Sequence, residues 1–221
     1  MAAPIFQPIS KVEAAERQLD TAIDLYFSSA DSLAVYTLAF ASFKMLFDLY
    51  PHHNDDGFAK QIDQMIAAEG WRSMSGPANF LKHADRDPDA LLAAHHPKQG
   101  MSVIGLATLL YRRISGDFTL KMRAFDFWVE QEGHDVLGIE EIDTNAERSA
   151  AHKEIRDAVN ALPDEAKMFF AQKQYRDFLE NYDRYVAMVD EAEAAGLTIT
   201  DILDGKARER LATREAEAPE T

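Results

Sequence analysis

The chain has 221 residues, 47% of them apolar and 28% charged, and carries a formal net charge of −15. Such a chain is long and apolar enough to bury a core, so an intrinsically disordered protein is excluded. It has no cysteine, which excludes disulfides, thiolate metal sites and a cysteine nucleophile. Its acidity argues against binding to nucleic-acid phosphates, which requires a basic surface.

The first two predicted elements are helices. Ser10 and Glu13 form a capping-box pattern ahead of a helix whose apolar face includes Leu19 and Ile23. Asp31 or Ser32 then caps a second helix that runs to about Tyr50 and is apolar nearly all the way round. A helix of this kind is normally central and buried, and its internal Lys44 and Asp48 favour a core helix over a membrane span.

Breakers divide the next part of the chain. The stretch 51–57, PHHNDDG, predicts a turn, and residues 58–69 predict a short helix that ends at Gly70. Pro77 is expected to open another helix that ends near Ala84. Asp87, followed by Pro88, is expected to cap a further short helix through Leu91 and Leu92.

Two further pairs of helices are expected in the remainder. Residues 100–115 and 118–131 form one pair, joined at a Ser-Gly-Asp turn. After an acidic loop over 133–143, Thr144 caps a helix to about Leu162, and a long helix follows from Pro163 to about Ala195. That helix carries an apolar stripe that serves either as internal core or as a dimer seam: Phe169, Phe170, Tyr175, Phe178, Tyr182, Tyr185 and Met188.

Together these elements predict an all-α fold, a bundle of about eight helices without strands. We expect a helical domain over residues 1–142, a helical pair over 143–215 that packs on it, and a flexible tail over 216–221. The start of the chain lacks the pattern of a secretory signal, which together with the missing cysteine favours a cytoplasmic location. A homodimer or a protein partner is expected, without a membrane, a metal or another cofactor.

The most distinctive stretch is residues 77–90, PANFLKHADRDPDA, where an apolar helix runs into dense charge. In one interpretation these polar residues are used locally, in caps and ion pairs at a helix junction. In the other they form a small polar ligand-binding pocket for an anionic ligand or a partner. The candidate ligand-binding residues are Asn79, Lys82, His83, Asp85 and Arg86.

Motifs for catalysis or metal binding are weak elsewhere. The pair His52-His53 precedes two aspartates, but it lies in a predicted turn, where nothing holds zinc ligands in a fixed frame. The dipeptide His134-Asp135 is similar to the His-Asp pair that binds metal in HD-type phosphohydrolases. In that family the pair ends an apolar helix, whereas here an acidic stretch precedes it. Glu-x-x-His, which carboxylate-bridged metal centres in helical bundles require, does not occur. No catalytic residue is therefore assigned.

Two resemblances bear on the same stretch. ANFLKH resembles the Arg-Asn-x-x-x-His signature of HEPN domains, all-α modules of RNA-cleaving toxins and defence proteins. Ala78 stands where that family has its arginine, so the resemblance implies a non-catalytic, nucleotide- or RNA-associated relative. Residues 10–135 as a whole resemble an uncharacterised family of bacterial all-α proteins that shares the segment Asn-Phe-x-Lys-His-Ala-Asp-Arg-Asp-Pro-Asp. The latter resemblance implies no activity, and a binding or interaction module is the first expectation.

Overall fold

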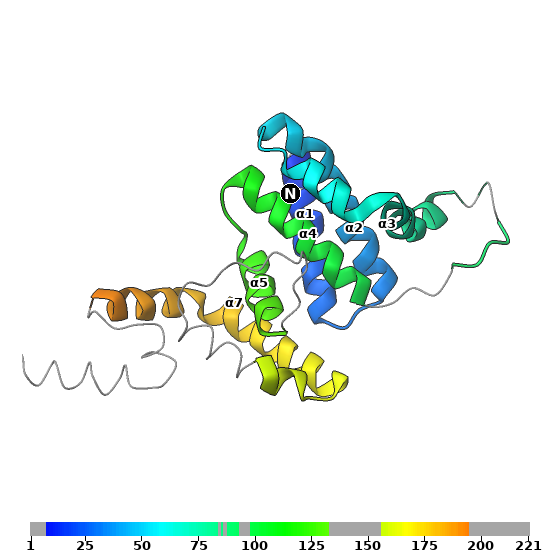
Figure 1. The fold of residues 1–221 in the computed structure, drawn as a ribbon. Helices are drawn as coiled ribbons and strands as arrows, with labels where there is room; N and C mark the ends of the chain where they lie inside the picture. Colours follow the sequence, from blue (N-terminus) through cyan, green and yellow to red (C-terminus); the bar gives the residue numbers. More distant parts are fainter. Residues whose placement is uncertain (1–7, 84, 86–87, 93–97, 133–155, 195–221) are drawn as a thin grey trace, which may run out of the picture. The chain divides into compact units, whose positions relative to one another are not determined.

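The structure is a computed structural model that describes residues 8–83, 85, 88–92, 98–132 and 156–194. Over these residues the fold is all-α without strands, as predicted (Figure 1). It comprises eight helices when the two halves of α3 and the helical residues 156–160 are counted separately. The chain divides into two compact units, Met1–Asp126 and Phe127–Thr221. The predicted boundary at residue 142 and the predicted tail lie outside the described residues.

Helix α1 (Lys11–Phe27) begins with the predicted capping box. The Ser10 amide donates to Glu13 Oε2 at 2.6 Å, and the Glu13 amide donates to Ser10 Oγ at 3.1 Å. These two bonds satisfy backbone donors that have no partner within the helix. The inward face of α1 is made of small and branched apolar side chains: Ala15, Leu19, Ala22, Ile23 and Phe27.

Helix α2 (Ser32–His53) is the central helix of the first unit, as predicted, because it packs against α1, α3 and α4 (Figure 1). Asp31 caps it by accepting hydrogen bonds from the Leu33 and Ala34 amides, both at 3.0 Å. Among the described residues, α2 is the one helix long and apolar enough to cross a membrane by length and composition. Here it supplies core residues such as Phe43 and Leu46.

The predicted end of α2 at Tyr50 is wrong. The helix continues through Pro51 to His53, and the Asn54 amide closes the last turn on the Tyr50 carbonyl at 2.9 Å. The Tyr50 ring is buried and its hydroxyl donates to Asp56 at 2.7 Å. These contacts stabilise one more helical turn, over residues 51–53, where the sequence predicted a loop.

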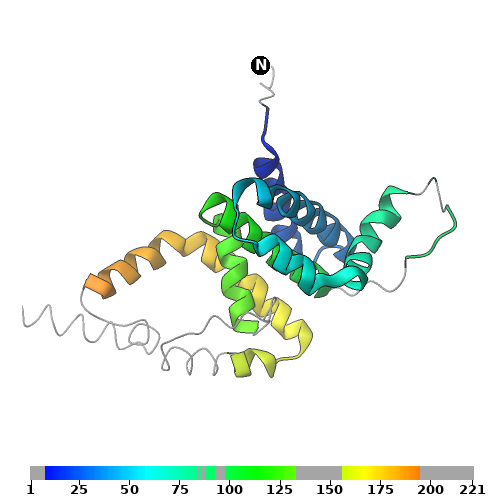
Figure 2. The same cartoon turned by 45° about the horizontal axis from the view of Figure 1, so that its top comes forward.

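Helix α3 (Phe58–Lys82) replaces the two short helices predicted on either side of residues 70–77. Its break lies earlier, at Ala67, which has φ 54° and ψ 172°, and the two halves run in different directions (Figure 2). Trp71 spans the kink: its ring lies 5.8 Å from that of Phe43, and its Nε1 donates to Asp63 at 2.7 Å. Pro77, expected to open a helix, is buried inside the second half.

The helix expected after Pro88 does not form within the described residues. Pro88 and Asp89 form a turn, and residues 90–92 have no regular secondary structure. Leu91, expected to be a helical residue, is 93% exposed. Asp87, the expected cap, lies outside the described residues.

Helices α4 (Lys98–Ser115) and α5 (Leu120–Glu132) form the predicted pair. The turn between them contains Gly116 at φ 87°, a conformation that glycine adopts without a steric penalty. Within the first unit, Phe125 of α5 packs edge-on against Tyr26 and Phe27 of α1, with ring centroids 6.0 and 6.3 Å apart.

The second unit contains the end of α5, helical residues 156–160 and the long helix α7 (Asp164–Ala194). The predicted start of α7 after Pro163 is confirmed, and the Lys167 amide bonds to the Pro163 carbonyl at 2.9 Å. Two aromatic contacts join α5 to α7, between Phe127 and Phe178 and between Trp128 and Phe170.

Candidate functional site

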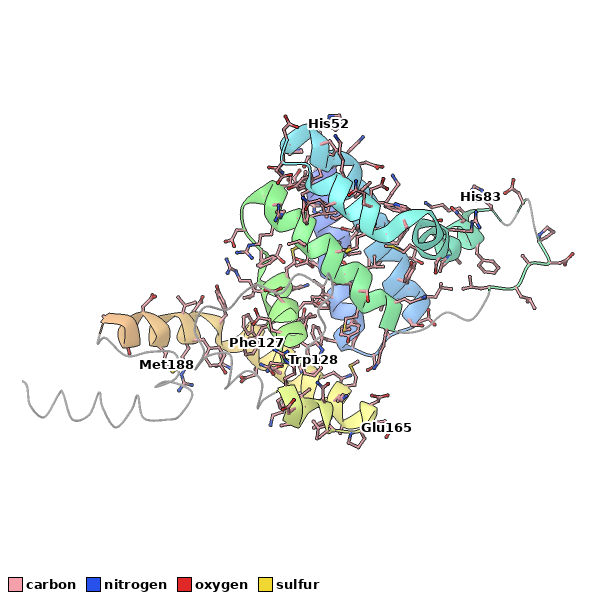
Figure 3. The ribbon with its side chains drawn as sticks, viewed as in Figure 1. His52, His83, Phe127, Trp128, Glu165 and Met188 are labelled. Atoms are coloured by element: carbon pink, nitrogen blue, oxygen red, sulfur yellow. The ribbon has the colours of Figure 1, made fainter. Side chains whose placement is uncertain are left out.

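The predicted site residues lie at and just beyond the C-terminal end of α3, as Figure 3 shows for His83. Asn79 and Lys82 are exposed on the last turns of the helix, His83 is half-buried at its C-cap, and Asp85 is exposed in the following turn. Arg86 lies outside the described residues. The structure therefore brings three of the five candidates onto one helix end and adds a fourth two residues further along the chain.

The helix ends here through its backbone. The His83 amide donates to the Asn79 carbonyl at 3.1 Å, and His83 leaves helical geometry at φ −118° and ψ 33°. One turn earlier, Pro77 and Ala78 are buried, which anchors the segment to the core. The exposed positions around Asn79 and Lys82 are consequently presented by a well-anchored turn.

Among the described residues, the side chains of Asn79, Lys82, His83 and Asp85 make no hydrogen bond or ion pair. These four side chains therefore do not form the caps and ion pairs that one interpretation of the sequence predicted for this junction. Asp89, in the same loop, is exposed as well. Polar groups in this arrangement remain able to bind something outside the chain.

An apolar groove adjoins this helix end. Leu81 of α3 forms one side, and the first turns of α2 form the other. The groove has a volume of about 380 Å³, and Leu81 is 45% exposed at its edge. The other lining residues are Asp31, the N-cap of α2, and Leu33, Ala34, Thr37 and Leu38 of α2.

The polar groups of the groove are already used by α2. Asp31 accepts from two backbone amides at the start of α2, and Thr37 donates to the Leu33 carbonyl at 2.7 Å. The lining accordingly offers mainly apolar surface, because its two polar side chains are bonded to the α2 backbone and no second titratable group pairs with Asp31 for general acid–base catalysis. The groove can accept an apolar side chain, and Lys82 and His83, the two residues that follow Leu81, can bond a polar or charged group.

The predicted metal motifs gain no support within the described part of the chain, where no three potential ligand side chains lie close enough to hold an ion. His52 and His53 are exposed on the last turn of α2, and His52 points outward in Figure 3. His134 and Asp135 lie outside the described residues.

A polar junction built around Asp56 was not predicted from the sequence. This carboxylate accepts from the Phe58 amide at 3.0 Å, from the Tyr50 hydroxyl and from Arg113 at 3.2 Å. The Arg113 guanidinium also lies 3.8 Å from the centroid of the Phe58 ring. The Phe58 amide, followed by Tyr50 and Arg113, holds the pKa of Asp56 below its ordinary value of 3.8. These contacts brace the α2–α3 turn against α4.

A second missed feature is a row of three carboxylates on α1, spaced four residues apart. Glu16, Asp20 and Asp24 accept from Tyr111, Thr119 and Lys121, respectively. Burial raises the pKa of Asp20 and, together with the bond to Glu16, raises that of Tyr111 to about 12. The spacing of the carboxylates is visible in the sequence, but their partners lie 95 to 99 residues away and are not.

No family model matches the chain, and neither the curated proteins nor the solved structures contain a significant match.

Proposed function

We propose that this chain is a binding module that docks a protein partner at the end of α3. The observation that supports this most directly is the combination of an apolar groove edged by Leu81 with uncommitted polar side chains beside it. Protein interfaces pair an apolar anchor in a pocket with a polar rim in this way. Leu33 and Leu38 line the groove, and Lys82 and His83, which follow Leu81 in the chain, would supply the polar contacts.

The partner is expected to carry basic residues around an apolar anchor. The chain has a net charge of −15, and Asp85 and Asp89 are exposed in the loop that follows α3. Complementary charge steers association and disfavours wrong partners more than it adds affinity. The apolar anchor would fill the groove, and basic side chains would lie toward the acidic loop.

A nucleotide-associated role, as the resemblance to HEPN domains implies, is the weaker alternative. Ala78, at the position of that family's arginine, is 5% exposed, so the position is turned into the core. Lys82 and His83 also lie at a helix C-terminus, whose carbonyl dipoles disfavour an anionic phosphate. Both observations favour a protein partner, and nucleotide binding abolished by His83→Ala would instead support the alternative.

Site-specific photo-crosslinking in cells that express the chain would test the proposal. A photoreactive residue at Leu81 should give a discrete adduct with a second protein, identified by mass spectrometry. The matched control is Met65, which is 48% exposed on the first half of the same helix. The control should give no such adduct.

Substitution then tests whether the groove holds the partner. Leu81→Asp should abolish the complex because it places an unpaired carboxylate in an apolar groove, whereas Met65→Asp should leave the complex intact. Both side chains are exposed, so both variants should keep the helical circular dichroism of the parent. A complex that persists in the Leu81→Asp variant would show that the partner does not dock in this groove.

A further inference from the structure

Helix α7 extends well beyond its contacts with α5. Besides the two aromatic pairs, Gln174 Nε2 donates to Gln131 Oε1 at 2.8 Å, so these three contacts with α5 are made by residues 170, 174 and 178 of α7. Residues 179–194 continue as about four more turns, roughly 24 Å of helix. In Figure 3, Met188 lies on this part of the helix, away from Phe127 and Trp128.

The apolar stripe of α7 keeps a seven-residue spacing across both parts. Residues spaced alternately four and three apart form its centre line: Ala171, Tyr175, Phe178, Tyr182 and Tyr185. The first three lie within the stretch that contacts α5, and Tyr182 and Tyr185 continue the line beyond it. Val186 and Met188 flank Tyr185, and each is 40% exposed. This pattern is typical of a helix that packs along its whole length.

The residues that flank the centre line carry no charge. They are Gln174, Leu179, Asn181, Val186 and Met188. Every charged residue between 173 and 191 instead falls on the outer positions of the repeat, as Arg176, Asp183 and Arg184 illustrate. In coiled coils these flanking positions normally select the partner through charge.

Neutral flanks matter because the whole chain is strongly acidic. A second copy brings the same net charge of −15, so flanking carboxylates would repel it. A partner of opposite charge would be recognised by charged flanks, which are missing here. The surface therefore suits an identical helix, which meets the same patch on its partner about a two-fold axis.

The ring of Tyr185 is already held in place for such packing. Its hydroxyl donates to Asp177 at 2.5 Å, and this bond raises the pKa of Tyr185. Asn181 also donates to Asp177, at 3.0 Å. A held aromatic ring loses less conformational entropy on association than a mobile one, and tyrosine supplies an apolar face with a polar tip.

We propose that two copies of this chain associate through the Tyr182, Tyr185, Val186 and Met188 face of α7. This surface belongs to the second unit, while the groove at Leu81 belongs to the first. A substitution that disrupts self-association through α7 therefore leaves the docking of a partner at Leu81 to be measured separately, and the reverse also holds.

Sedimentation equilibrium of the full-length chain tests the association. The parent should sediment at twice its mass of 24.8 kDa. Val186→Asp and Met188→Asp should each raise the dimer dissociation constant at least about a hundredfold, because each places two carboxylates in an apolar seam. The matched control is Ala187→Asp, one residue away on the exposed outer face, which should leave the dimer unchanged.

Crosslinking identifies what covers the face. A photoreactive residue at Met188 should produce a covalent dimer of this chain. An adduct with another part of the same chain, or with a different protein, would overturn the proposal. So would a parent that stays monomeric at about 100 μM, a concentration at which dimers of micromolar affinity form. A dimer that survives Val186→Asp and Met188→Asp would place the contact elsewhere and overturn it too.

Discussion

Thr119 and Asp20 are 99 positions apart in the chain, yet Thr119 Oγ1 donates a hydrogen bond of 2.6 Å to Asp20 Oδ1. The same hydroxyl accepts from the Met122 amide at 3.2 Å, so it also caps the start of α5. One side chain thus begins a helix and ties that beginning to α1. Lys121 adds an ion pair with Asp24 one turn further along α1.

Asp20→Asn should leave the stability of the first unit unchanged or raise it at neutral pH. Burial raises the pKa of Asp20, so the folded state holds the proton more tightly than the unfolded state. The cost of the buried charge is therefore present above the folded pKa and disappears as the pH falls through it. An asparagine still accepts from Thr119 but carries no charge.

Urea denaturation at several pH values measures this effect. The midpoint of Asp20→Asn should equal or exceed that of the parent near neutrality, and the two should converge below the ordinary Asp pKa of 3.8. A midpoint that falls on substitution at neutral pH would mean that attraction to Lys121 outweighs burial.

Thr119→Val should destabilise the chain by about 1–3 kcal/mol, because it removes the cap of α5 and leaves the Asp20 carboxylate without its donor. Thr119→Ser keeps the hydroxyl and is the control. In the double variant Asp20→Asn/Thr119→Val the loss should be smaller than in Thr119→Val alone, since an unpaired amide is less costly to bury than an unpaired carboxylate. Equal losses would show that only the cap matters.

Asp56→Ala should lower the melting temperature at neutral pH and have little effect in acid. The folded pKa of Asp56 lies below 3.8, so its contribution to stability is present above that value and is lost as the pH falls through the folded pKa. Asp55→Ala is the control, because the neighbouring Asp55 is exposed. Thermal melts of both variants over this pH range measure the difference, and a loss for Asp56→Ala that is independent of pH would contradict the assignment.

Ala67→Gly should stabilise the chain by about 1 kcal/mol, since a residue with a Cβ pays a steric cost at φ 54° and ψ 172° that glycine does not. Ala41→Gly, inside the regular helix α2, should instead cost about 0.5–1 kcal/mol. Urea denaturation compares the two variants. A loss of stability at both positions would indicate that α3 does not bend at Ala67.

Local chemistry in the sequence predicted the helices whose ends depend on neighbouring residues. The capping box of Ser10 and Glu13 could be predicted because both partners lie within one helical turn of each other. The all-round apolar character of α2 likewise required a central position, since each of its faces must be covered. The start of α7 after Pro163 follows the same local logic.

Proline and glycine did not end the helices at the positions predicted, because buried contacts keep the chain helical there. The Pro51 turn stays helical beside the buried Tyr50, and Pro77 lies inside α3 because its face is buried. Gly70 does not end α3, since Trp71, next to it, packs on Phe43 and binds Asp63 across the kink. These contacts join residues 8 to 28 positions apart, beyond the reach of breaker rules.

At the candidate site, the dense charge after an apolar helix was enough to point to the polar residues that include Asn79, Lys82 and His83. That these side chains make no bond within the described residues, and that Leu81 meets the start of α2 in a groove, follows from the packing of the folded chain. The reason is physical: residue types and helix ends depend on interactions within one or two turns, whereas a groove exists only where helices distant in the chain pack together. The partners of Asp20 and Asp56 were decided in the same way.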